Sequence, residues 1–140
     1  MQNTIYTNNK EFAILKEGTY KSHDFIITTC GYYPAAYIKL LNQFAPELAN
    51  TWDKFDFIKV HGGISFIGKC YLSKDEGHWI GWDYNCAGDY NDSYPYNSYK
   101  NYNTKKWTIK EIYEEIKLVI DQVIVVKDYA LWKLLTDNHN

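Results

Sequence analysis

Four side chains of the kinds that bind metals or assist hydrolysis lie in the segment Lys59–Tyr90. They are His61, Asp83, Cys86 and Asp89, and the last three follow one another at intervals of three positions. Imidazole, thiolate and carboxylate groups are common protein ligands of zinc. The set therefore predicts a divalent metal site, with zinc as the candidate ion, at which a bound water would be activated for hydrolysis.

The same segment allows chemistry without a metal. Cys86 would be a nucleophile, His61 or His78 its general base, and an aspartate the group that orients the base. Cysteine hydrolases assemble such a trio in space, so the sequence order does not decide the matter. A purely structural interpretation is also open: the aspartates bond to backbone amides in turns, and Cys86 is an unreactive buried thiol. Catalytic residues thus stay candidates only.

A third interpretation is a binding surface. Tyrosines interleaved with Asn and Ser follow the cluster, a composition typical of binding loops with rigid rings and adaptable polar contacts. Such a loop could stack nucleobases, hold a phosphate-bearing ligand or meet a protein partner; otherwise its rings pack back on the domain. The residues that we expect to contact a ligand or partner are His61, Gly62, Gly63, Trp82, Asp83, Tyr90, Tyr94, Tyr96 and Tyr99.

Length and composition limit these alternatives. A chain of 140 residues is most simply one domain, residues 1–140, with one core. Its formal charge of -2 argues against general binding to nucleic acid, which requires a basic face. The first residues do not have the pattern of a signal peptide, and the apolar runs are too short to span a membrane. Three dispersed cysteines then predict reduced thiols in the cytoplasm. The oligomeric state cannot be inferred.

The elements that must position the candidate residues follow from hydrophobic periodicity. Residues 1–11 form a loosely held N-terminus in which Ile5 and Tyr6 could begin an edge strand, and Glu17-Gly18 predicts a turn. Pro34 favours a short helix over Ala35–Phe44, where apolar residues recur at helical spacing. The predicted strands cover 25–29, 55–60, 64–72 and 79–82. The last three suggest an antiparallel meander with His61 and Asp83 at strand ends.

The C-terminal part contains the strongest pattern. Residues 91–106 are predicted to form a long Tyr-rich loop. Thr108 and Glu111 fit a capping box, and apolar residues recur every three or four positions from Ile109 to Val123. A long amphipathic helix over Thr108–Val126 is expected, with Leu131, Trp132 and Leu135 adding a further turn. The fold class is α+β: a small antiparallel sheet, a short helix, and a long C-terminal helix packed on one face.

Three sequence blocks resemble a family of small phage and prophage proteins without an established biochemical role. They are Cys30-Gly31-Tyr32, His61-Gly62-Gly63-Ile64-Ser65-Phe66, and Trp79-Ile80-Gly81-Trp82-Asp83-Tyr84-Asn85-Cys86-Ala87-Gly88-Asp89. The similarity extends from about Tyr20 to Val126, judged by the order and spacing of the blocks. The family pattern typically has histidine at the position of Cys86, and a cysteine near Tyr84 or Asn85. Because this chain has Cys86 where the family pattern has histidine, we expect binding rather than catalysis.

The resemblance implies a cytoplasmic accessory protein that acts against host defence. It would inhibit a host protein such as a CRISPR nuclease complex, or bind a nucleotide second messenger. Two alternatives remain from the sequence: a metal-dependent, phosphodiesterase-like hydrolase acting on a nucleotide signal, and a structural or virion-associated protein.

Overall fold

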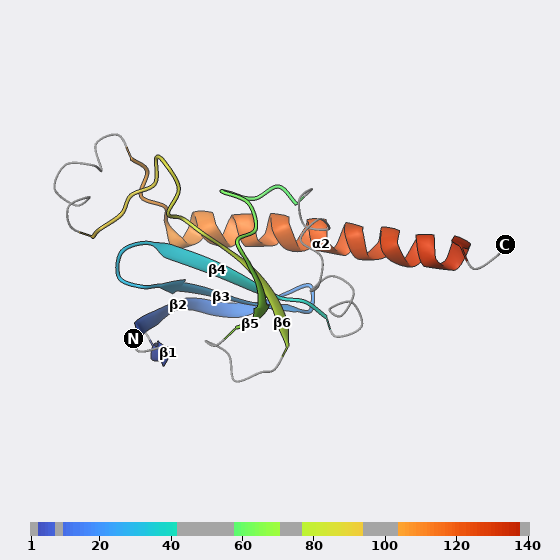
Figure 1. Cartoon of the computed structure of the whole chain (residues 1–140), viewed down its shortest axis with the longest axis horizontal. Coiled ribbons are helices and arrows are strands. Elements are labelled where there is room, and N and C mark those ends of the chain that lie inside the picture. The colour runs from blue at the N-terminus through green and yellow to red at the C-terminus, as the bar shows by residue number, and fades with distance from the viewer. Residues whose placement is uncertain (1–2, 8–9, 42–57, 71–76, 94–103, 138–140) are drawn as a thin grey trace.

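The computed structural model describes residues 3–7, 10–41, 58–70, 77–93 and 104–137 (Figure 1). Within these ranges one sheet and one helix, α2, are present. The strands are β1 (Asn3–Thr7), β2 (Lys10–Tyr20), β3 (His23–Thr29), β4 (Pro34–Lys39), β5 (Phe66–Lys69) and β6 (His78–Asp83); α2 is Ile109–Asp137. The sheet order is β1-β2-β3-β4-β6-β5, and every neighbouring pair is antiparallel.

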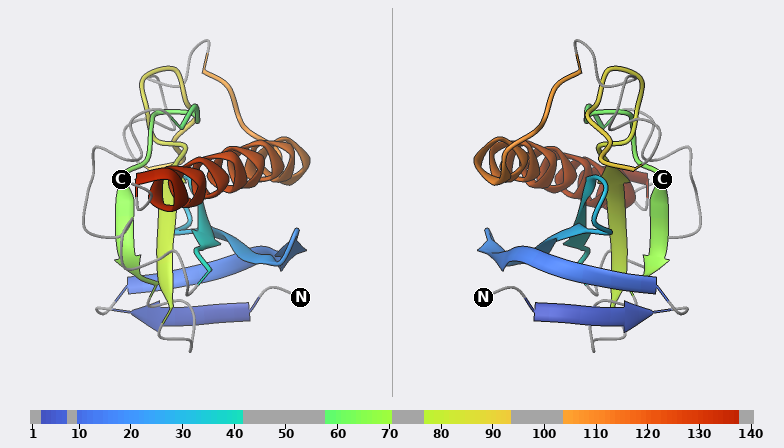
Figure 2. Two further views of the ribbon diagram at one scale, coloured as in Figure 1. Left: turned by 90° about the vertical axis from the view of Figure 1, so that its right-hand side faces the viewer. Right: turned by 90° about the vertical axis from the view of Figure 1, so that its left-hand side faces the viewer.

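Helix α2 crosses one face of the sheet, as Figures 1 and 2 show. Alternate strand residues point toward it, because side chains along a strand alternate between the two faces. The main core contains Phe25, Ile27, Ala36, Ile38, Ile80 and Trp82 from the strands and Ile112, Ile116, Val119, Ile120 and Val123 from α2. A second, smaller cluster joins Ile26, Cys70 and Trp79. The predicted α+β class, with its amphipathic helix on one face, is confirmed.

The start of α2 has the predicted capping box. The Glu111 amide donates to Thr108 Oγ1 at 3.1 Å, and Glu111 Oε1 accepts from the Thr108 amide at 3.1 Å. Both interactions satisfy backbone donors that the first helical turn leaves without intrahelical partners. The helix continues beyond the predicted end at Val126 to Asp137, so the further turn expected around Leu131 belongs to the same helix.

The predicted short helix over Ala35–Phe44 is wrong where the structure describes it. Residues Pro34–Lys39 form β4, with Ala36 and Ile38 buried and Tyr37 half-buried on the opposite face. Residues 42–44 lie outside the described ranges. The apolar spacing fits both periods, and pairing with β3 on one side and β6 on the other decides for the strand.

The predicted turn at Glu17-Gly18 is also wrong, because both residues lie inside β2. The chain turns instead at Lys21 and Ser22, which adopt positive φ values of 46° and 68°. Gly18 fits within the strand because the Phe25 ring lies against it, where a β-carbon would come within 3.0 Å of the ring.

The predicted strand boundaries hold for β3 and β6 and fail in part elsewhere. The strand expected over 55–60 has no counterpart at residues 58–60, and residues 55–57 lie outside the described ranges. The strand expected over 64–72 is shortened to β5 within the described residues. The meander is interrupted, because β6 lies beside β4 and β5 takes the edge. The N-terminal segment supplies the opposite edge as β1. In the described part of the chain, no helix has the length and apolar character needed to cross a membrane.

Candidate functional site

His61 and Asp89 form the centre of the candidate site. His61 Nε2 lies 2.6 Å from Asp89 Oδ2, and the Asp89 side chain is only 3% exposed. The His61 side chain is 22% exposed, so one partner is buried and the other reaches the surface. An imidazole N–H that donates to a buried carboxylate has its tautomer and ring orientation fixed by that bond. The two residues are 28 positions apart, and the fold brings them into direct contact.

The Asp89 carboxylate accepts two further N–H groups. The Cys86 amide donates to Oδ2 at 2.9 Å, and the Trp107 indole donates to Oδ1 at 2.9 Å. Burial by itself raises the pKa of this carboxyl, but the hydrogen bonds from His61, the Cys86 amide and Trp107 together outweigh burial and lower the pKa below its ordinary value. Asp89 is therefore a buried anion that joins three separate parts of the chain.

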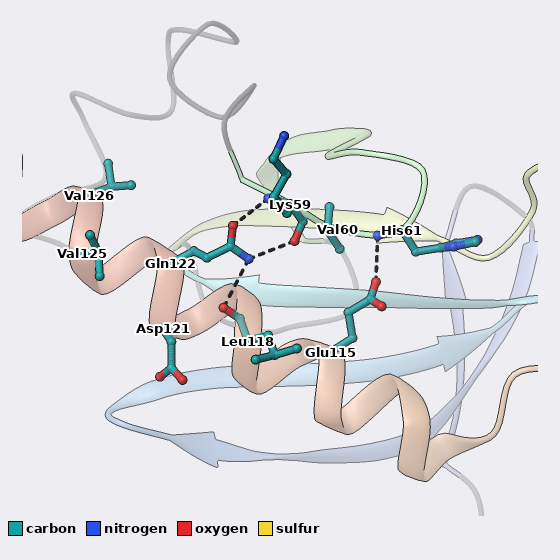
Figure 3. A pocket seen from close by; sticks show the side chains of 9 residues that line it. All are labelled: Lys59, Val60, His61, Glu115, Leu118, Asp121, Gln122, Val125 and Val126. Carbon is teal, nitrogen blue, oxygen red and sulfur yellow. Dashed lines mark hydrogen bonds between the residues drawn. The ribbon is translucent and has the colours of Figure 1, made fainter.

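Helix α2 holds the backbone that presents His61. Glu115 Oε1 accepts the His61 amide at 2.8 Å, and the Gln122 carboxamide bonds both the amide and the carbonyl of Lys59, at 2.6 and 2.9 Å. Figure 3 shows these bonds, with the imidazole directed away from Glu115. A turn follows at Gly62 and Gly63, both at positive φ, and the Gly63 amide donates to the Val60 carbonyl at 3.0 Å.

Gly62 is needed for a second reason besides its φ of 71°. A β-carbon at this position would overlap Cys86 Sγ, so the turn after His61 packs directly against the loop that follows β6. In that loop the Asn85 amide donates to Asp83 Oδ1 at 3.1 Å, and the Asp89 amide donates to the Cys86 carbonyl at 3.0 Å. Asp83 therefore stabilises its own loop, as the structural interpretation of this residue expects.

Aromatic rings enclose the imidazole. Tyr84 stacks on His61 with ring centroids 5.0 Å apart and planes inclined by 8°. Trp107 contacts both rings, at 4.8 Å from His61 and 5.1 Å from Tyr84. Tyr84 is fully buried and accepts a hydrogen bond from the Trp82 indole at 3.0 Å. Trp82 thus supports the site from the core, and it is not a surface contact residue.

Three of the four predicted metal donors come together. Donor atoms of His61, Cys86 and Asp89 all lie within 4.8 Å of one another, and Asp83 is not among them. The chemistry of the set fits a metal only in part. Burial and the nearby carboxylates of Asp89 and Asp83 raise the pKa of the free Cys86 thiol, so a zinc ion would have to displace the thiol proton as it binds. The bond between His61 and Asp89 would also have to open for an ion to enter.

The raised pKa of the Cys86 thiol also lowers the fraction of thiolate that could act as a nucleophile. His78 begins β6 and Asp83 ends it, so His78 lies at the far end of the strand from the Cys86 loop. The arrangement can orient an imidazole and hold a carboxylate, and the described residues offer no activated nucleophile beside them.

Tyr84 and Trp107 also belong to the lining of a pocket of about 210 Å³. Five aromatic residues line it, from the β3–β4 turn, the segment after β6 and the approach to α2: Tyr32, Tyr33, Tyr84, Tyr90 and Trp107. The charged side chains of Asp92 and Lys106 belong to its lining, and both residues are exposed. We call this the aromatic pocket. Its lining combines Gly31 and Tyr32 with residues that follow Asp83 in the sequence.

A wider hollow of about 720 Å³ lies between residues 59–61 and α2 (Figure 3). Its lining is mostly apolar and includes Leu118 and Val125, which are 62% and 67% exposed. The polar groups of Glu115 and Gln122 on this side are used to hold the backbone at Lys59 and His61.

The predicted site residues are therefore divided between several locations. His61 and Asp89 bond directly, Gly62 and Cys86 touch beside them, and Tyr90 lines the aromatic pocket. Gly63 completes the turn after His61, and Trp82 is core. Tyr94, Tyr96 and Tyr99 lie outside the described ranges.

Several residues of the site were absent from the sequence prediction: Tyr84, Trp107 and Glu115 around His61, and Tyr32, Tyr33, Asp92 and Lys106 in the aromatic pocket. Trp107 has a signal in the sequence, because it precedes the Thr108 cap and packs with the core around Ile112, which is the pattern of a hydrophobic staple. Glu115 has no such signal, since a charged residue on a helix is usually solvated. Comparisons of the chain with protein-family models, with curated protein sequences and with solved structures found no match.

Proposed function

We propose that this protein binds a small ligand with a flat ring, of the nucleotide class, in the aromatic pocket. The observation that carries the proposal is the lining itself: five aromatic residues, all but the buried Tyr84 at least partly exposed, with one cation and one carboxylate, Lys106 and Asp92. Base–aromatic stacking contributes about 1–3 kcal/mol per base. At about 210 Å³ the pocket suits a base-sized ring, with any sugar and phosphate reaching solvent.

Binding is better supported than catalysis. The Asp89 carboxylate already accepts three N–H groups, and one of them, the Trp107 indole, belongs to the lining of the aromatic pocket, so Asp89 supports that wall. Cys86 has a raised thiol pKa and therefore little thiolate at neutral pH. The His61–Asp89 pair thus rigidifies the pocket, and a rigid pocket loses less entropy when a ligand binds.

The test is isothermal titration with a panel of mononucleotides and cyclic nucleotides against the whole protein. Tyr32→Ala removes the most exposed ring, 52% exposed, and should weaken binding at least fivefold. Leu118→Ala is the matched control, because it truncates an exposed apolar residue outside the pocket and should leave the affinity unchanged. Equal losses in both variants, or no binding by any nucleotide, would refute the proposal.

The biological setting that we propose is capture of a nucleotide signal, or inhibition of a host protein, by a phage-type accessory protein. It rests on the sequence resemblance alone. A pull-down from host cytoplasm with the intact protein separates the two: a co-purified nucleotide supports capture, and a stoichiometric protein lost with Tyr32→Ala supports inhibition at the same surface.

A second candidate function is a metal-dependent hydrolase, favoured by the proximity of the His61, Cys86 and Asp89 donor atoms. Metal analysis of the purified protein, followed by assay of cyclic nucleotides, tests it. The hydrolase requires a 1:1 metal that His61→Ala removes and that His78→Ala retains. Metal-free protein that still binds nucleotides would refute the hydrolase and keep the binding proposal.

A further inference from the structure

We infer that the aromatic pocket prefers guanine among the nucleobases, and that Asp92 and Lys106 read its edge. This inference rests on the proposed function, because it specifies the ligand class of the same pocket. It starts from the positions of the two charged side chains around Tyr90.

Asp92 and Lys106 flank different parts of the Tyr90 side chain. The Tyr90 hydroxyl donates to Asp92 Oδ1 at 3.1 Å, and Lys106 Nζ lies 5.1 Å from the centroid of the Tyr90 ring. The Asp92 amide donates to the Tyr32 carbonyl at 3.0 Å, so the backbone at Asp92 lies against the backbone of the residue with the most exposed ring of the pocket. A cation and an anion are thus held by one tyrosine, within the lining of one pocket.

Within the part of the chain that the structure describes, the hydrogen-bonding capacity of Asp92 is only partly used. Among the described residues its carboxylate has one partner, the Tyr90 hydroxyl, so Oδ2 and the second lone pair of Oδ1 can accept further donors. An ionised carboxylate accepts hydrogen bonds and donates none. It therefore favours a ligand edge that presents two adjacent donors and disfavours an edge that presents an acceptor.

Of the common bases, guanine alone has two adjacent donors on its Watson–Crick edge, N1–H and the 2-amino group. The O6 acceptor lies next to them and is complementary to the Lys106 ammonium, which only donates. Adenine and cytosine place an acceptor beside a single donor, and uracil places its one donor between two acceptors. Each of these three would direct an acceptor toward the Asp92 carboxylate.

Tyr32 and Asp92 have different roles in the pocket. Tyr32 supplies a ring face without regard to base identity, because every base has a π face. Asp92 supplies the discrimination, because an unmatched polar group is penalised more than a matched one is rewarded. Tyr32 is therefore expected to set affinity for all bases, and Asp92 the ratio between them.

Titration of the whole protein with guanosine, inosine and adenosine tests the inference; nucleosides are used so that Lys106 cannot act through a phosphate. Guanosine should bind about tenfold or more tightly than adenosine, which corresponds to one hydrogen bond to a charged group. Inosine keeps O6 and N1–H but lacks the 2-amino group, so its affinity should fall between the two.

Asp92→Asn provides the decisive variant. The amide offers one acceptor and one donor, so the guanosine preference should fall at least fivefold and adenosine should gain. Asp128→Asn makes the same chemical change at an exposed site on α2 and should leave the order intact. Binding of all three nucleosides with equal affinity, still sensitive to Tyr32→Ala, would overturn the guanine preference and keep the proposed function. No binding of any nucleoside or nucleotide would overturn both.

Discussion

Replacing Asp89 with asparagine tests the hydrogen bonds at the centre of the site. The carboxylate accepts N–H groups from His61, from the Cys86 backbone and from the Trp107 indole, at 2.6, 2.9 and 2.9 Å. Asparagine retains one acceptor oxygen and replaces the other with a donor. If the oxygen stays with Cys86, the new NH₂ group faces the Trp107 N–H, and two donors oppose each other in a buried place.

The expected cost follows from these bonds. Losing a hydrogen bond to a charged group costs about 1.5–3 kcal/mol, and a buried donor left without an acceptor costs about 1–3 kcal/mol more. The free energy of unfolding of Asp89→Asn should therefore fall by about 3 kcal/mol or more. With a urea m value of about 1–3 kcal/mol/M, the midpoint of unfolding should move by about 1–3 M.

Urea unfolding followed by tryptophan fluorescence and by circular dichroism supplies the measurement. Asp83→Asn is the matched control, because the one bond to the Asp83 carboxylate among the described residues comes from the Asn85 amide of its own loop, at 3.1 Å. That variant should lose about 1 kcal/mol or less. If the two variants are equally stable, Asp89 does not join the three segments as described.

Three further outcomes follow from the same contacts. Because folding lowers the pKa of Asp89, its carboxylate contributes to the free energy of unfolding above a pH of about 4, and this contribution is lost as the pH falls through the folded-state pKa. The difference in stability between wild type and Asp89→Asn should therefore become smaller at acidic pH. Thr108→Ala should lower the free energy of unfolding by about 1 kcal/mol, and Thr108→Ser should restore most of it. Gly62→Ala should lower the free energy of unfolding by about 2 kcal/mol, because of its positive φ and the overlap with Cys86. Adding Cys86→Ala should restore only the part of this loss that comes from the overlap. If the double variant is as stable as the wild type, the positive φ causes no strain.

The elements that the sequence predicted well are those with a single consistent signal. Thr108 and Glu111 combine with an apolar stripe that has only a helical period, and the structure confirms both the cap and the helix. The segment from Pro34 to Lys39 has apolar residues that fit either period. Local sequence could not decide there, because the decision depends on β3 and β6, which lie on either side of it.

The sequence predicted some candidate residues of the site and none of its connections. His61 and Asp89 were both candidates, and the fold brings them into direct contact. Asp83 has the same chemistry as Asp89 but caps the Asn85 amide of its own loop. Spacing alone cannot separate two such aspartates, since the difference lies in which one the Trp107 segment approaches, a contact between parts of the chain that are distant in sequence.

Helix α2 forms hydrogen bonds to the backbone of the segment Lys59–His61, as a neighbouring strand would, but through its side chains. Gln122 and Glu115 are seven positions apart on one side of the helix, and they bond the backbone at Lys59 and His61, which are two positions apart. Because the grip is on peptide groups, the side chain at Lys59 is free to vary. A deletion of one residue between Lys59 and His61, by contrast, would leave a different amide opposite Glu115 and withdraw the imidazole from Asp89. The protein should thus tolerate substitutions in this segment far better than deletions.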